Sequence, residues 1–182
     1  MMDFRTPSQT VGPFFSIGLS WPGGAHVVPE GTPGGIWIRG AVLDGAGEPV
    51  PDALLESWQA NQDGAFVAHA EAGRFGRFRG LGRCPTSPDG TFGFFTIKPG
   101  RVPDARGALQ APHIAVAIFA RGLIEHLVTR IYFVDEDNDM DPVFRSLEHD
   151  PRRRTLLATV EPGGYHFDVR LQGPNETIFF AL

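Results

Sequence analysis

The sequence predicts a mainly β protein: an antiparallel β-sandwich with a short helical insertion and an extended N-terminal arm. Its 182 residues include 23 glycines and 16 prolines, and both residue types disfavour helix interiors. Hydrophobic residues make up 42% of the chain and aromatic residues 11%, which is enough to build a packed core. Short apolar segments separated by turn residues are typical of a sandwich.

The predicted arm covers residues 1–35, which are rich in Gly, Pro and Ser and show no sustained periodicity. Pro7 and Pro13 fix their own φ angles and bias the residues before them towards extended backbone. Residues 36–182 form the predicted sandwich domain, and neither a repeat nor a linker divides it further.

The predicted strands are short and lie between turn signals such as Asp44-Gly45, Asp89-Gly90 and Gly173-Pro174. They cover residues 36–43, 53–58, 91–97, 113–120, 127–134, 165–171 and 177–180. The segments at 113–120 and 127–134 are the most strongly β-like.

Helical signals occur in one region only. Asp141 precedes Pro142, which predicts a helix with an aspartate cap and a proline at its first position. Asp150 and Pro151 repeat this arrangement before residues 152–159. The insertion is therefore expected to contain two short helices.

Charge and cysteine content exclude several classes. The formal net charge of −5 argues against a general nucleic-acid binder. Cys84 is the only cysteine, so an intrachain disulfide is impossible and a reducing compartment is favoured. Residues 1–20 lack a signal-peptide pattern, and no apolar run approaches the length of a membrane span. A soluble, cytoplasmic protein is expected.

Two histidine positions are candidates for a metal site. His113 and Ala115 point to the same strand face, so only half of a His-x-His pair is present. His166 and Asp168 share a face of a later strand and are the candidate site of a self-sufficient metal enzyme. The alternatives are a structural strand histidine and a surface pair. A purely binding or structural sandwich also stays open.

Six short segments, in order along the chain, resemble the intradiol ring-cleavage dioxygenases. They are TPSQTVGPF at 6–14, LESWQAN at 55–61, TIKPG at 96–100, APHI at 111–114, FARG at 119–122 and TRIYF at 129–133. The resemblance implies a β-sandwich of the intradiol dioxygenase type. Catalytic members of this family hold a non-haem Fe(III) with two tyrosinates and two histidines, and anionic phenolates stabilise Fe(III) over Fe(II).

The resemblance also shows that this chain lacks most of the metal ligands. The tyrosine positions correspond to Phe66 and Val102, and the His-x-His pair corresponds to His113 and Ala115. The arginine that helps to polarise the catecholate corresponds to Gln110. The chain contains 15 Phe but only two tyrosines, Tyr132 and Tyr165, and neither is at a ligand position. No catalytic residue and no metal are therefore expected in this chain.

The resemblance implies a non-catalytic alpha subunit, with the iron held by a homologous beta subunit. Together, as αβ units of a larger oligomer, they would cleave 3,4-dihydroxybenzoate (protocatechuate) with O2 between the two hydroxyl-bearing carbons. The product would be 3-carboxy-cis,cis-muconate, in the beta-ketoadipate pathway of aromatic catabolism. The chain alone is expected to be inactive, and neither nucleic acid nor membrane is an expected partner.

Part of this chain is expected to line the partner's substrate pocket. The resemblance assigns this role to Gly12 and Pro13 of the arm, to Phe14, and to Arg121 near the substrate carboxylate. Relatives often have tyrosine in place of Phe14, so a hydroxyl contact is lost here. An arginine at a strand end is suited to charge-assisted hydrogen bonds with an aromatic acid. A salt bridge from Arg121 to the partner chain is the equal alternative. The arm, residues 1–35, is expected to pack on the partner.

Overall fold

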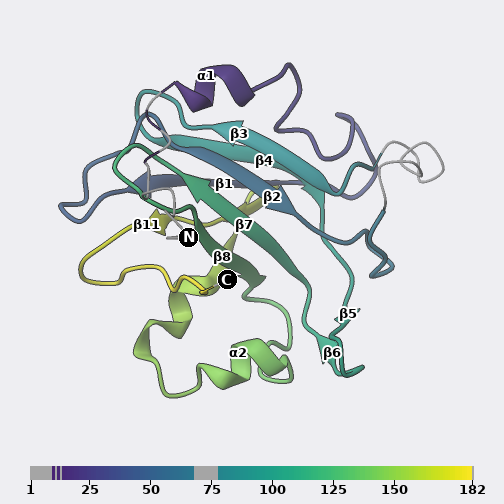
Figure 1. Ribbon diagram of the computed structural model, residues 1–182. Helices are drawn as coiled ribbons and strands as arrows, with labels where there is room; N and C mark the ends of the chain where they lie inside the picture. The colour runs from purple at the N-terminus through teal and green to yellow at the C-terminus, as the bar shows by residue number, and fades with distance from the viewer. Residues whose placement is uncertain (1–9, 11, 13, 68–77, 182) are drawn as a thin grey trace, which may run out of the picture.

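The structure is a computed structural model that describes residue 10, residue 12, residues 14–67 and residues 78–181. Strands dominate this part of the chain (Figure 1). The strands are β1 Gly35–Leu43, β2 Leu54–Trp58, β3 Leu81–Pro85, β4 Thr91–Ile97, β5 Val102–Pro103, β6 Leu109–Gln110, β7 His113–Phe119, β8 Leu127–Phe133, β9 Leu157–Glu161, β10 Gly164–His166 and β11 Val169–Arg170. The helices are α1 Phe15–Leu19, α2 Pro142–Ser146 and the 3-10 helix η2 Pro151–Leu156.

The main sheet runs in the order β11-β1-β10-β9-β8-β7-β2-β3. β10 and β11 pair with successive parts of β1, and β4 also pairs with β1. Strand β9 joins the two halves, since it pairs with β10 on one side and with β8 on the other. β5 and β6 form a separate two-stranded ladder, which lies beyond the end of β7 in Figure 1.

The core lies between the two halves of the folded sheet. Strand β7 alternates half-buried and buried residues along its length, as expected for a strand with one face on the core. Its buried face packs with residues from β1, β2, β4 and β8 in one continuous cluster that includes Ile38, Leu55, Phe94, Ile118 and Ile131. The other face of β7 carries His113 and Ala115, so these residues point away from the core.

The helices lie at the margins. Helix α1 runs beside β3 (Figure 1), where Arg83 Nη1 donates a hydrogen bond to the Leu19 carbonyl over 2.8 Å. Helix α2 follows β8, and the Asp141 side chain caps it by accepting from the amides of Val143 and Phe144. No helix in the described ranges has the length and apolarity to cross a membrane.

Most predicted elements are confirmed, and the exceptions have clear causes. The five strands predicted between residues 36 and 134 occur within two residues of their expected ends. The predicted aspartate caps at Asp141 and Asp150 are both present. The prediction of helix over 152–159 is wrong beyond Leu156, because the backbone from Leu157 pairs with β8 and β10.

Three further expectations need correction. The strand predicted over 165–171 is interrupted, and β10 and β11 pair with β1 in parallel, so the sheet is mixed rather than purely antiparallel. Residues 177–180 form no ladder, although Ile178 accepts a hydrogen bond from buried Thr129. Helix α1 lies in a region where no helix was expected.

Candidate functional site

Two of the positions that the resemblance assigns to iron ligands, His113 and Ala115, lie on the outer face of β7. Ala115 lies between two larger residues in the register of the sheet, with Trp58 of β2 on one side and Arg130 of β8 on the other. His113 is two residues away on the same face, and its register partner is Tyr132. The sheet thus brings together residues that are far apart in the sequence.

Phe66 joins this group through Trp58. The two rings are stacked, with 6.0 Å between their centroids and an angle of 4° between their planes. Phe66 remains 51% exposed. A phenyl ring has no donor atom for a metal, so this position contributes apolar surface only.

Val102 and Gln110 are register partners in the β5–β6 ladder, and both are buried. The Gln110 Oε1 atom accepts a hydrogen bond from Arg130 Nη1 over 2.8 Å. The same nitrogen lies 3.2 Å from the Tyr132 hydroxyl oxygen, to which it also donates. The Arg130 guanidinium therefore connects the β5–β6 ladder, which contains Val102 and Gln110, to β8, the strand that pairs with β7 at Ala115.

His113 is held in one tautomer. Its Nδ1 lies 2.8 Å from the Ala111 carbonyl oxygen. Because a carbonyl only accepts hydrogen bonds, Nδ1 carries the proton and Nε2 is left as an acceptor. Burial lowers the pKa of His113, so the ring is kept neutral. Its ring packs against that of Tyr132 at 5.7 Å.

Behind His113 lies a fully buried carboxylate, Asp141. Its Oδ1 accepts from the Tyr132 hydroxyl over 3.2 Å and from two α2 amides, while Oδ2 accepts from the Ala111 amide over 2.8 Å. Burial raises the pKa of the Tyr132 hydroxyl above its usual range, so Tyr132 remains a neutral phenol. This network fixes the loop that precedes β7. The Tyr132 hydroxyl takes part in it by donating a hydrogen bond to Asp141 and accepting one from Arg130.

These side chains do not fit a bound Fe(III). Phe66, Val102 and Ala115 supply no donor atoms, and His113 supplies a single nitrogen. The Arg130 guanidinium hydrogen-bonds to Gln110 and Tyr132, and its positive charge would repel a cation nearby. In the described part of the chain, no group of three or more His, Cys, Asp or Glu side chains is arranged to hold a metal.

Arg130 was not predicted from the sequence, because its contact with Gln110 joins β8 to β6, and the two-residue strand β6 has no periodic pattern. The resemblance assigns the family's arginine to Gln110, and here a guanidinium from another strand hydrogen-bonds to that residue.

A second group of candidate residues lies around Arg121, just after β7. The Arg121 Nε atom is 2.9 Å from Asp52 Oδ2, and the Arg121 side chain is 66% exposed. The adjacent Gly122 amide donates a hydrogen bond to the Thr10 hydroxyl over 3.2 Å. This contact brings the N-terminal arm to the strand end that carries Arg121.

The arm residues themselves are only partly described. Gly12 has a φ of +70°, a left-handed conformation that glycine adopts without steric cost. Phe14 is 78% exposed. Pro13 lies outside the described residues. The structure therefore brings the arm close to Arg121 through Thr10, and it leaves Phe14 at the surface.

The alternative metal pair, His166 and Asp168, forms a surface ion pair. His166 Nε2 lies 3.0 Å from Asp168 Oδ1, and about half of each side chain is exposed. Asp168 Oδ1 also accepts a hydrogen bond from the Ala41 amide, which anchors the carboxylate to β1. This arrangement agrees with the surface-pair interpretation.

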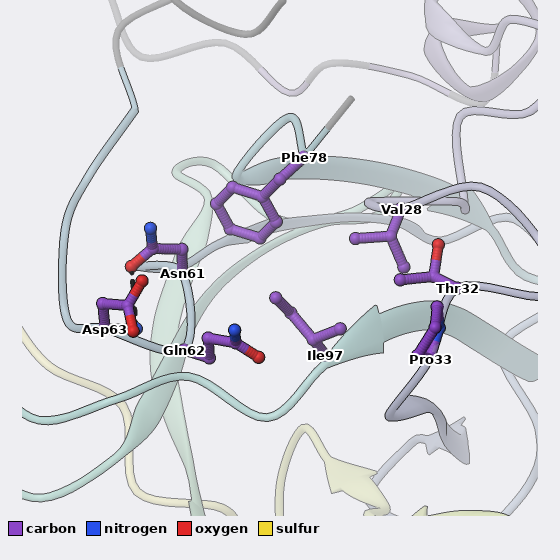
Figure 2. A pocket seen from close by; sticks show the side chains of 8 residues that line it. All are labelled: Val28, Thr32, Pro33, Asn61, Gln62, Asp63, Phe78 and Ile97. Atoms are coloured by element: carbon purple, nitrogen blue, oxygen red, sulfur yellow. Dashed lines mark hydrogen bonds between the residues drawn. The ribbon is translucent and has the colours of Figure 1, made fainter. Parts of the chain in front are cut away.

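A cavity of about 360 Å³ lies elsewhere in the molecule (Figure 2). It is lined by Val28, Thr32, Pro33, Asn61, Gln62, Asp63, Phe78 and Ile97. Figure 2 shows the Asp63 carboxylate beside Asn61, and none of the labelled side chains is cationic. The described lining of the cavity includes neither the residues around Ala115 nor Arg121.

Comparisons with known proteins agree with this geometry. The sequence profile of the family described as Dioxygenase matches residues 12–173. The protocatechuate 3,4-dioxygenase alpha chain of Pseudomonas putida is 40% identical, with 97% of this chain and 96% of that relative covered. The beta chain of the same enzyme from Burkholderia cepacia is 36% identical, over 84% of this chain and 71% of the relative.

A solved structure supports the fold. The dioxygenase domain of a dioxygenase carbohydrate-binding protein fusion from Streptomyces sp. SirexAA-E aligns with a TM-score of 0.60 at 28% identity. The alignment covers 94% of this chain and all of that domain. The expectation of an intradiol-type β-sandwich is therefore confirmed. The chain belongs to the intradiol dioxygenase family and is a homologue of protocatechuate 3,4-dioxygenase alpha chains.

Proposed function

We propose that this chain is the non-iron alpha subunit of a protocatechuate 3,4-dioxygenase and acts only in complex with a homologous beta subunit. The proposal rests on Phe66, Val102 and Ala115, which offer no donor atom at the positions that the resemblance assigns to metal ligands, and on the Arg130 guanidinium that hydrogen-bonds to Gln110. The similarity to alpha chains over nearly the whole length supports it.

In this proposal the beta subunit holds the Fe(III), which activates the catecholate towards O2 when bound there. This chain contributes binding and orientation. Arg121 donates hydrogen bonds to the carboxylate of protocatechuate, and Gly12, Pro13 and Phe14 line the pocket wall. The Thr10 contact with Gly122 supports this assignment, because it places the arm beside Arg121.

The N-terminal segment, residues 1–35, is proposed to pack on the beta subunit through its exposed part, since Val27 and Val28 are buried in a cluster with Phe95 of this chain. Residues 36–182 form the sandwich domain. Two exposed apolar side chains of the described part support this, since Phe14 and Ile17 are each more than 70% exposed. Apolar surface of this kind is often covered in an assembly. The αβ units assemble into a larger oligomer in the cytoplasm, where the single cysteine, Cys84, would stay reduced.

The test is to purify the chain alone and together with a candidate beta subunit, and to measure iron content and protocatechuate-dependent O2 uptake. Iron and activity are expected only in the sample that contains the beta subunit. Stoichiometric iron and activity in the lone chain would refute the proposal. Failure to form any complex with the beta subunit would favour a purely structural or binding sandwich instead.

A further inference from the structure

Asp52 is an unusual carboxylate for a position so close to the surface. Only 17% of its side chain is exposed. Both of its carboxylate oxygens are shielded from solvent, and neither accepts a hydrogen bond of good geometry within the described part of the chain. A shielded carboxylate without hydrogen-bond donors is unfavourable unless a cation is close. The side chain therefore depends on Arg121, the cation that faces it.

The fold places these two residues opposite one another. Strands β2 and β7 are antiparallel, and Leu54 is the register partner of Phe119. Asp52 lies two residues before Leu54 and Arg121 lies two residues after Phe119, and both are in turns at this end of the ladder. The antiparallel pairing therefore brings the two turns to the same end of the sheet, where Arg121 Nε lies 2.9 Å from Asp52 Oδ2.

The contact leaves most of the guanidinium free. Arg121 approaches Asp52 through Nε, and among the described residues it has no other acidic partner. A guanidinium whose Nε faces one carboxylate can still present its two terminal nitrogens to a second carboxylate in a bidentate manner. An arginine held in this way has also lost part of its rotamer freedom before a ligand arrives.

We infer that Asp52 is a positioning residue that orients the Arg121 guanidinium for the carboxylate of the aromatic acid. This inference rests on the proposed function, in which Arg121 faces the partner's substrate pocket. Asp52 does not touch the substrate. Its role is to fix which edge of the guanidinium is turned to its own chain and which edge is offered outward.

The opposite expectation follows if Asp52 acts only through its charge. A carboxylate near an anion-binding arginine weakens the attraction for an anionic ligand. Removing that charge would then improve binding of protocatechuate. The two roles of Asp52 therefore predict changes of opposite sign, and one substitution separates them.

The experiment uses the αβ complex and compares KM and kcat for protocatechuate with those for catechol, which has no carboxylate. Asp52→Asn is expected to raise the KM for protocatechuate roughly tenfold, with a much smaller change in kcat and no change for catechol. Asp52→Asn combined with Arg121→Ala is expected to behave like Arg121→Ala alone. Asp139→Asn, a remote exposed carboxylate paired with Arg153, is the matched control.

A fall in KM, or no change, in the Asp52→Asn complex would overturn the positioning role if Arg121→Ala still separates the two substrates. If Arg121→Ala affects both substrates equally, the proposed role of Arg121 fails, and the inference fails with it. Should Asp52→Asn not assemble, Asp52→Glu keeps the charge and displaces the carboxylate by one methylene. A KM for protocatechuate that is selectively raised in that variant supports positioning, and a parental KM contradicts it.

Discussion

The Arg130 guanidinium donates a hydrogen bond to Gln110 Oε1 over 2.8 Å, at the position where catalytic relatives are expected to carry an arginine of their own. The two side chains come from β8 and β6. The hydrogen bond therefore brings a cation from β8 to the residue that the resemblance assigns to the family's arginine.

Restoring the ligands alone is predicted not to restore iron binding. A chain with Phe66→Tyr, Val102→Tyr and Ala115→His would still have the Arg130 guanidinium beside the new site, and it would repel Fe(III). Adding Arg130→Gln is expected to raise the iron content after gel filtration, measured by metal analysis. Equal iron in the two variants would contradict this role of Arg130.

The same series predicts a folding cost at one position. Val102 is buried, so a tyrosine there must displace its neighbours, at a cost of about 1–3 kcal/mol of unfolding free energy. Phe66 is half exposed, and Phe66→Tyr is expected to be close to neutral. Urea unfolding of the single variants measures the difference.

His113 is predicted to make stability depend on pH. Burial lowers its folded-state pKa below the unfolded value of about 6.5. As the pH falls through and below 6.5, the unfolded chain takes up the proton first, so this contribution to stability is complete above that pH and declines below it. Thermal unfolding between pH 7.5 and 5 is expected to show the decline.

His113→Asn removes the titrating ring and keeps a side-chain donor near the Ala111 carbonyl, so its pH profile is expected to be flatter. His149 is 94% exposed, and His149→Asn serves as the matched control with a parental profile. A parental slope in the His113→Asn variant would show that other groups cause the decline.

Asp141 is predicted to be one of the most sensitive positions for folding. Asp141→Asn places an amide NH2 opposite the Ala111 N–H or the α2 amides, so at least one buried donor loses its acceptor. The expected loss is about 2–4 kcal/mol of unfolding free energy. Tyr132→Phe removes one of the four hydrogen bonds that the Asp141 carboxylate accepts in the described part of the chain, together with the hydrogen bond from Arg130, and it is expected to lose about 1–2 kcal/mol.

Asp150 provides the control for this prediction. It caps η2 in the same manner but at the surface, so Asp150→Asn is expected to change the urea midpoint much less than Asp141→Asn. Similar losses at both positions would mean that capping alone, rather than the buried network, accounts for the effect of Asp141.

Arg121 is predicted to govern the choice among catechols. In the αβ complex, Arg121→Ala is expected to raise the KM for protocatechuate about 10- to 100-fold, because charged hydrogen bonds of about 1.5–3 kcal/mol are lost. Catechol should be much less affected. Arg152→Ala removes an arginine that pairs with Asp150 and Glu176, and it should leave the ratio of KM values unchanged.

The sequence was sufficient for elements whose pattern is local. Strand β7 alternates cleanly, and the Asp141-Pro142 pair marks a helix start, so both were predicted correctly. Residues 157–159 carry no such local signal. They become part of β9 only because β8 and β10 offer backbone partners on both sides, which no short window of sequence contains.

The site shows the same division. The resemblance to a family assigns Phe66, Val102 and Ala115 to metal-ligand positions, and this assignment stays a prediction. It could not identify Arg130 or Asp52, because their partners Gln110 and Arg121 come from distant parts of the chain. Their significance depends on register and on distance, and both are set by the assembled sheet.

Arg121 and Gly122 are consecutive residues. Arg121 pairs with Asp52, and the Gly122 amide donates a hydrogen bond to Thr10 of the arm. In the proposed complex, a displacement of the arm would therefore reach the guanidinium directly through the backbone of these two residues. Substitutions that weaken the contact between the subunits would then also change which aromatic acids the enzyme prefers. Screens for altered substrate range should accordingly return variants of the subunit contact.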